Sequence, residues 1–132
     1  MKVKPVLKER EKLYHPLGVI LFRRNIESEI IRDDKNEIIK VIQNKEQLRE
    51  LITSIKDELG EHAIIAVDQE DGRVRRLIVP TFEMRPAAET FGKIAEEEGI
   101  EAAYAKCKEN YKNIGLELKE VGFNANFAPV AE

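Results

Sequence analysis

The sequence is poor in the residues that support metal binding and disulfide formation. It contains one cysteine, Cys107, two histidines and no tryptophan among 132 residues. A single cysteine cannot form an internal disulfide, and a lone thiol fits a reducing compartment, so we expect a cytoplasmic protein. Cysteine and histidine form no cluster of the kind that binds zinc, and the acidic run at 68–72 has its glycine one position too early for a calcium loop. We therefore expect neither a metal nor another cofactor.

Long apolar runs and an excess of basic residues are missing too. Lys and Arg number 22 against 25 Asp and Glu, which gives a net charge of −3. This balance argues against a nucleic-acid partner, and the absence of any apolar run near ~20 residues argues against a membrane-spanning helix. No secretory signal is recognised at the start. The 42% hydrophobic and 36% charged residues indicate one globular domain over residues 1–132, which is shorter than the ~250 residues of a complete (β/α)8 barrel.

Strand-like and helix-like segments alternate along most of the chain. Short apolar runs at 18–22 and 63–67 are typical of parallel strands buried on both faces, and a third strand is predicted at 123–130. Helical periodicity predicts helices at 45–59, 87–98 and 100–121, and two helical turns at 7–14. Asn44 is a predicted N-cap, while Gly60 and Gly122 are predicted stops. This alternation indicates an α/β fold with a parallel sheet.

Two further segments are rich in apolar residues. Residues 29–43 are rich in isoleucine around a polar group at 33–36, which favours a β-hairpin, with an extension of the following helix as the alternative. In the helix predicted at 100–121, Ile100, Tyr104, Cys107 and Tyr111 lie on an apolar stripe, so we expect them in the core.

The segment with the densest set of charged side chains is the loop at 68–76, directly after the second apolar strand. It carries three carboxylates and three guanidiniums, a set that can bind sugar hydroxyls or simply pair within a solvated loop. Loops at the carboxyl ends of parallel strands are where ligands bind in such folds. His15 and His62 lie elsewhere and are expected to be structural or exposed.

Three motifs in this order resemble the bacterial β-N-acetylhexosaminidases of glycoside hydrolase family 3. Residues 67–76 read VDQEDGRVRR against the family's V-D-Q-E-G-G-R-V-x-R. Residues 18–25 read GVILFRRN against G-V-I-L-F-x-R-N, and residues 126–132 read NFAPVAE against N-F-A-P-V-x-D. Together the motifs extend over most of the chain from Pro16 onward.

The resemblance implies the N-terminal portion of a TIM-type (β/α) barrel from enzymes that remove terminal N-acetylglucosamine from cell-wall fragments. By position, Asp68 and Arg76 would bind hydroxyls of the amino sugar, and Glu70 and Arg73 would brace the loop. The expected partner is therefore an amino sugar or a cell-wall (peptidoglycan) fragment, and neither a nucleic acid nor a membrane.

The departures from the family pattern are as informative as the matches. Asp71 replaces a family glycine, Glu132 replaces an aspartate, and 29–43 is an insertion. The K-H-F-x-G-H-G motif that supplies the family's acid/base does not occur in the sequence, and the family's nucleophile comes from a still later strand. We therefore expect no catalytic residue in this chain and no activity from it alone. The alternatives are a non-catalytic amino-sugar-binding α/β module, or one half of a split barrel completed by a separately encoded C-terminal half.

Overall fold

A computed structural model describes residues 15–130. The helical turns predicted at 7–14 and the end of the third motif at 131–132 lie outside these residues. No described helix combines the length and apolar character needed to cross a membrane.

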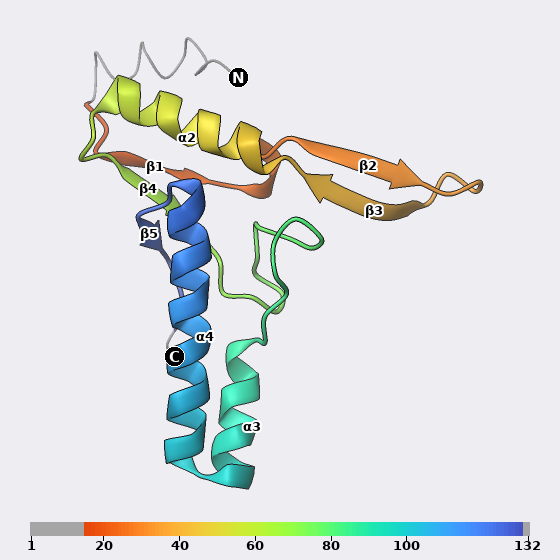
Figure 1. Ribbon diagram of the computed structural model, residues 1–132, viewed down its shortest axis with the longest axis vertical. Helices are drawn as coiled ribbons and strands as arrows, with labels where there is room; N and C mark the ends of the chain where they lie inside the picture. Colours follow the sequence, from red (N-terminus) through yellow and green to blue (C-terminus); the bar gives the residue numbers. More distant parts are fainter. Residues whose placement is uncertain (1–14, 131–132) are drawn as a thin grey trace.

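Three parallel strands form the centre of the molecule (Figure 1). They are β1 (Gly18–Leu21), β4 (Ile64–Val67) and β5 (Ala125–Asn126), in the order β1-β4-β5. Gly18 pairs with Ile64, and a Cβ at Gly18 would collide with the Ile64 carbonyl, so glycine permits this close pairing. The parallel sheet is confirmed. The third strand is shorter than predicted, because pairing with β4 stops at Asn126 apart from a hydrogen bond from the Phe127 amide to the Val67 carbonyl (2.9 Å).

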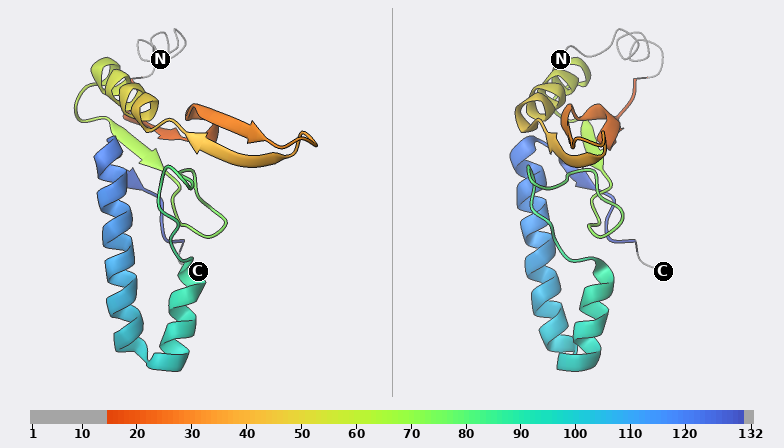
Figure 2. Two further views of the ribbon diagram at one scale, coloured as in Figure 1. Left: turned by 45° about the vertical axis from the view of Figure 1, so that its right-hand side comes forward. Right: turned by 90° about the vertical axis from the view of Figure 1, so that its right-hand side faces the viewer.

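Helices α2 (Lys45–Leu59) and α4 (Ile100–Val121) cover one face of the sheet (Figure 2). The predicted caps of α2 are confirmed, since Asn44 Oδ1 accepts a hydrogen bond from the Gln47 amide at 3.0 Å and Gly60 follows the last turn. The core between helices and sheet is almost entirely aliphatic; its largest fully buried side chains are Leu48, Ile52, Ile65, Leu77, Ile114, Val67 and Val121.

The opposite face of the sheet is only partly covered by the described residues. Ile20 is 37% exposed and Ile64 48% exposed, although their neighbours Leu21 and Ile65 are buried. The prediction that these strands are buried on both faces is therefore wrong at Ile20 and Ile64, although it holds at Ala66, which is 2% exposed. The reason is geometric: side chains alternate across a strand, and within residues 15–130 the helices that cover the sheet pack on one side of it.

A β-hairpin leaves the end of β1 and points away from the sheet (Figure 1). After the short 3₁₀ helix η1 (Arg23–Asn25), β2 (Ser28–Arg32) pairs with β3 (Ile38–Gln43) in an antiparallel ladder. Asp33 Oδ1 shapes the turn by accepting hydrogen bonds from the amides of Lys35 (2.9 Å) and Glu37 (2.8 Å). The hairpin prediction is confirmed, and the helical alternative is wrong.

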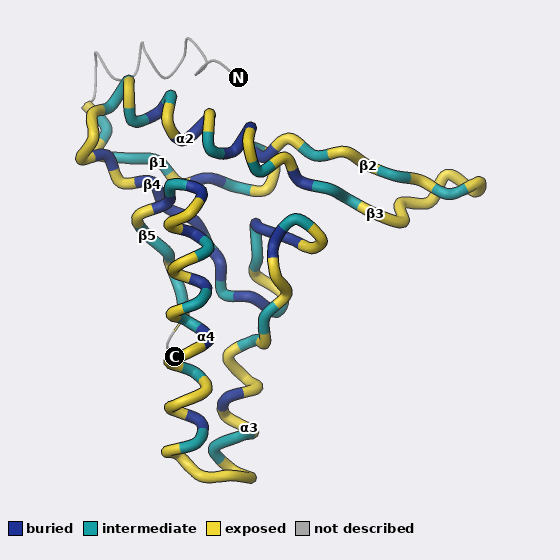
Figure 3. The backbone as a smooth tube through the Cα atoms, in the orientation of Figure 1, coloured by how far each residue is buried: buried dark blue, intermediate teal, exposed yellow. Residues whose placement is uncertain are grey.

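Helix α3 (Ala88–Glu98) and the first part of α4 form a second projection. Figure 3 shows that exposed residues dominate its outer end, away from the sheet. Ile100 is 78% and Tyr104 61% exposed, so their predicted places in the core are wrong; Cys107 and Tyr111 are half-buried. Of the residues of α4, those in its last turns join the main core, and the outer turns pack against α3.

Candidate functional site

The residues of the VDQEDGR motif lie at the carboxyl end of β4. Asp68 follows Val67 directly, and the chain from there to the start of α3 contains no other helix and only an isolated bridge between Asp71 and Val74. Because β1, β4 and β5 are parallel, their carboxyl ends lie along the same edge of the sheet. Segments 22–25, 68–81 and 126–130 therefore meet there.

Asp68 and Arg76 form an ion pair at this edge. Arg76 Nη2 lies 2.8 Å from Asp68 Oδ2, and both side chains are about three-quarters buried, with 25% and 23% exposed. The Arg76 guanidinium also lies over the ring of Phe22, 5.6 Å from its centroid. Within the described residues, Arg76 Nε is buried without a partner. The pair thus presents an oriented carboxylate beside a guanidinium with unused donor capacity, which suits a polyhydroxylated ligand.

Gln69 fixes the backbone that carries Arg76. Its side chain is 3% exposed, and its Oε1 accepts hydrogen bonds from the amides of Arg76 (2.9 Å) and Leu77 (3.0 Å). Its Nε2 donates to the Leu77 carbonyl (3.3 Å) and to Asp71 Oδ1 (3.1 Å). All the polar groups of this amide therefore have partners, and the loop folds back on itself around one side chain.

A second buried glutamine holds the same loop from the hairpin. Gln43, the last residue of β3, is 2% exposed. Its Nε2 donates to the Arg76 carbonyl (2.8 Å), and its Oε1 accepts from the Ile78 amide (2.9 Å). Its own carbonyl accepts from Thr81 Oγ1 (2.8 Å). The β2–β3 hairpin is thereby joined to the loop at Arg76 and at two residues that follow it, Ile78 and Thr81.

Asn126 and Glu70 connect the loop to β5 and to the residues that follow it. Asn126 Oδ1 accepts from the Gln69 amide and its Nδ2 donates to the Gln69 carbonyl, both at 3.0 Å. Glu70 Oε2 accepts from the Val130 amide at 3.2 Å. Arg73 is exposed, and its side chain forms no hydrogen bond or ion pair with another residue in 15–130. The structure thus brings Asp68 and Arg76 together and attaches Glu70 to the third motif.

Asp71 occupies the position where the family has glycine, and its backbone has a φ of +61°. Its side chain is 4% exposed, with Oδ1 bonded to Gln69 and Oδ2 without a partner in the described part of the chain. Burial raises the pKa of this carboxyl, and the nearby Arg85 charge partly offsets the increase. The left-handed backbone is one that aspartate tolerates better than most residues.

Sequence reasoning missed Gln43 and Gln69 as organisers of the site. Gln69 was inside a recognised motif, and that is the only signal that pointed to it. No group of three or more metal-ligating side chains is found in residues 15–130.

The fold and the site together define an α/β protein with a cluster of paired polar side chains at the carboxyl ends of parallel strands, where ligands bind in such folds. No family model matches the chain. It is 36% identical over 126 residues to a β-hexosaminidase of Neisseria meningitidis serogroup C, covering 94% of this chain and 30% of that protein. A β-hexosaminidase of Bordetella avium is 33% identical over the same length, with 94% and 31% covered.

The structure of the chain also resembles solved structures of this kind of enzyme. A structure of NagZ from Neisseria gonorrhoeae in complex with zinc ion superimposes with a TM-score of 0.77 at 32% identity, covering 97% of this chain and 33% of that one. A second NagZ structure from this organism, in complex with N-trifluoroacetyl-D-glucosamine, gives 0.74 at 34% identity, with 97% and 32% covered. Over nearly its whole length the chain is thus similar in sequence and in structure to bacterial β-hexosaminidases, and it spans about a third of the length of these relatives.

Proposed function

We propose that this chain forms part of the sugar-binding site of a cytoplasmic β-N-acetylhexosaminidase that acts on peptidoglycan fragments. The observation that carries the proposal is the Asp68–Arg76 pair at the carboxyl end of a parallel strand, in a sequence homologous to β-hexosaminidases. A carboxylate accepts hydrogen bonds from two neighbouring hydroxyls, and the guanidinium donates to their oxygens. One related structure is described as a complex with N-trifluoroacetyl-D-glucosamine, which supports an amino sugar as the ligand class.

The sheet supports a place for the chain in a partial (β/α) barrel. Its strands are parallel and follow the order of the chain once the β2–β3 insertion is set aside. Helices α2 and α4 lie on one face, where the outer layer of a barrel would be, and Ile20 and Ile64 project from the other. In a barrel this second face is filled by inward-pointing side chains from all of the strands.

Binding of N-acetylglucosamine to the 132-residue chain, measured by calorimetry, tests the sugar site. We expect weak binding that Asp68→Ala abolishes and that Asp57→Ala, an equal change of charge on the exposed face of α2, leaves unchanged. Absence of heat at millimolar sugar, with circular dichroism showing a folded chain, would count against the site.

Hydrolysis requires groups that we do not assign to these residues. Retaining glycosidases use two carboxyl groups about 5 Å apart, one as nucleophile and one as acid/base. We therefore propose that the chain alone does not hydrolyse its ligand. Turnover of an aryl N-acetylglucosaminide by the purified chain, lost in Asp68→Ala, would overturn this part of the proposal.

The exposed sheet face favours a second candidate, in which the chain is completed by a separately encoded C-terminal half. Ile20 and Ile64 are aliphatic residues open to solvent on the face that a barrel would close. Co-expression with the remaining two-thirds of a homologous β-hexosaminidase tests this: a stable, active complex is expected. Failure of the two parts to co-purify removes this candidate and leaves a non-catalytic amino-sugar-binding module.

A further inference from the structure

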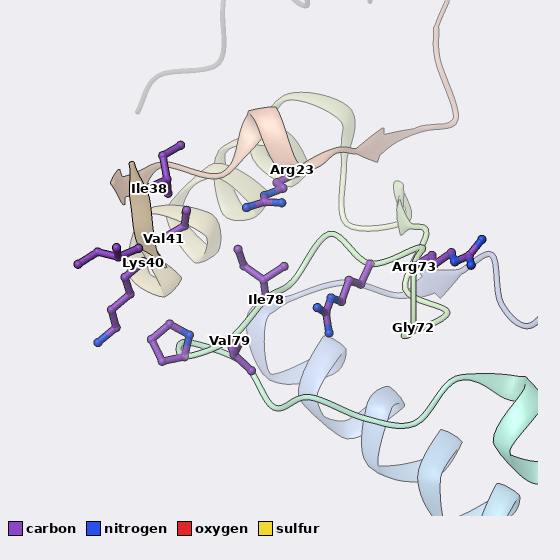
Figure 4. A pocket seen from close by; sticks show the side chains of 11 residues that line it. Arg23, Ile38, Lys40, Val41, Gly72, Arg73, Ile78 and Val79 are labelled. Atoms are coloured by element: carbon purple, nitrogen blue, oxygen red, sulfur yellow. The ribbon is translucent and has the colours of Figure 1, made fainter. Parts of the chain in front are cut away.

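A cavity of about 770 Å³ lies between the β2–β3 hairpin and the loop that follows β4. The hairpin wall consists of residues 38–41, and the loop wall includes Gly72, Arg75 and residues 78–80. Figure 4 shows Arg23 extending from η1 toward the part of the loop that carries Ile78. One wall therefore belongs to the segment that the sequence identified as an insertion, so the cavity is not a consequence of the three shared motifs alone.

The lining of this cavity has charge of one sign. It includes Arg23, Lys40, Arg73 and Arg75, and no acidic residue. None of the four side chains forms an ion pair or hydrogen bond with another residue in the described range. Four cationic side chains without a partner in the described residues therefore line this cavity, although the net charge of the chain is −3.

The two carboxylates whose pKa these cations influence, Glu89 and Asp71, have other direct partners. Arg73 lowers the pKa of Glu89 only as a minor cause, after the direct contact of Glu89 with Lys93, and in Figure 4 Arg73 points away from the hairpin. Arg75 is the smallest of the influences on the pKa of Asp71, whose Oδ1 is already bonded to Gln69. Arg23, Lys40 and Arg75 thus remain available to an external anion.

The cavity is continuous with the surface beside the sugar site. A neighbouring hollow is lined by Phe22 and Arg76 and shares Arg23, Ile38 and Val41 with the cavity. A ligand that reaches Asp68 and Arg76 can therefore extend past Arg23 into the cationic space. Guanidinium and ammonium groups bind oxyanions by charge-assisted hydrogen bonds, while Ile38, Ile78 and Pro80 provide apolar contact for the carbon skeleton.

We propose that this cavity binds an oxyanionic substituent of the saccharide ligand, so that the chain prefers acidic amino sugars to neutral ones. This rests on the proposed sugar site at Asp68 and Arg76. The oxyanion belongs to a carboxylate or to a phosphate, and the two are distinguished by the ligands used in the test.

Calorimetric titration of the full chain at low ionic strength compares three ligands: N-acetylglucosamine, N-acetylmuramic acid as the carboxylate, and N-acetylglucosamine 6-phosphate. We expect at least one acidic sugar to bind about tenfold more tightly than the neutral sugar, a gain equal to one charge-assisted hydrogen bond. High salt should remove most of this gain. The acidic sugar that shows it identifies the oxyanion.

Two variants on separate elements locate the effect. Lys40→Gln in β3 and Arg75→Gln in the loop should each lower affinity for the acidic sugar severalfold and leave that for N-acetylglucosamine unchanged. Lys112→Gln, an equal loss of charge on the exposed surface of α4, is the control. Equal affinity for acidic and neutral sugars overturns the inference, as does an equal loss in Lys112→Gln. If N-acetylglucosamine binds but the acidic sugars bind no more tightly, only the cavity assignment fails. If Asp68→Ala does not change the affinity for N-acetylglucosamine, the proposed sugar site itself fails.

Discussion

Replacing Gln69 by leucine should reveal how much of the loop's order depends on one side chain. Leucine has nearly the volume of glutamine but no polar atoms, so the change removes hydrogen bonds without opening a cavity. The amides of Arg76 and Leu77 lose their acceptor, and the Leu77 carbonyl and Asp71 Oδ1 lose a donor. The variant thus isolates the polar role of the side chain.

The expected cost follows from these four groups. An unpartnered buried polar group costs ~1–3 kcal/mol, and here the Leu77 amide is fully buried while the Arg76 amide is only partly so. We expect a loss of ~3–4 kcal/mol in the free energy of unfolding, a large share of the ~5–15 kcal/mol typical of a domain. Affinity for N-acetylglucosamine should fall as well, because Arg76 loses its backbone anchor.

Urea unfolding followed by circular dichroism measures the change, with an unaltered m-value as the sign that the two-state comparison holds. Glu96→Leu, an exposed polar-to-leucine change on α3, is the control and should stay within ~0.5 kcal/mol of the wild type. A Gln69→Leu chain within ~1 kcal/mol of the wild type would refute the reasoning, because water or a rearranged loop would then satisfy the orphaned groups.

Three further changes test other parts of the structure. Asp71 is more readily protonated when folded, so its contribution to stability is largest below the unfolded pKa and is lost as pH rises through the folded value. Asp71→Asn should therefore raise the melting temperature at pH 7 and weaken its pH dependence; a lower melting temperature at pH 7 contradicts this. Gly122→Ala should cost ~1–3 kcal/mol in urea unfolding, because φ is +109° and the new Cβ would lie 2.8 Å from Ile52 Cγ2; an unchanged midpoint argues against this geometry. The open sheet face should make the wild-type chain self-associate, and Ile64→Lys should reduce this because it places a charge on that face; analytical ultracentrifugation measures the effect. A wild-type chain that is monomeric at high concentration contradicts this expectation.

The helices were predicted well because the residues that start, stop and pattern a helix lie close together in the sequence. Asn44 caps α2, and Gly122 ends α4 in a left-handed conformation, as the sequence indicated. Burial was harder to predict, because it depends on which elements pack together. An apolar pattern alone could not show that Ile64 faces solvent or that Tyr104 lies beyond the reach of the core.

The candidate site was predictable only in part. The motif pointed to Asp68 and Arg76, which do meet at 2.8 Å, although their assignment to sugar binding came from the resemblance rather than from physical reasoning. Gln43 could not have been found this way, because it lies 33 residues from the carbonyl to which it donates. The cationic cavity was hidden for the same reason, since the hairpin's direction decides whether Lys40 and Arg75 share a space.

The α3–α4 projection has a consequence for how the molecule exchanges its amide protons. Ile114, Leu118 and Val121 join the main core and Tyr111 packs against its edge, whereas Phe91 lies outside it and contacts Tyr111 with 6.4 Å between ring centroids. The outer turns can therefore open without exposing the sheet, and protection should rise steadily along α4 toward its carboxyl end. One continuous helix of 22 residues would thus span two levels of local stability, with the firmer end supporting the strand that leads to Asn126 and the ligand loop.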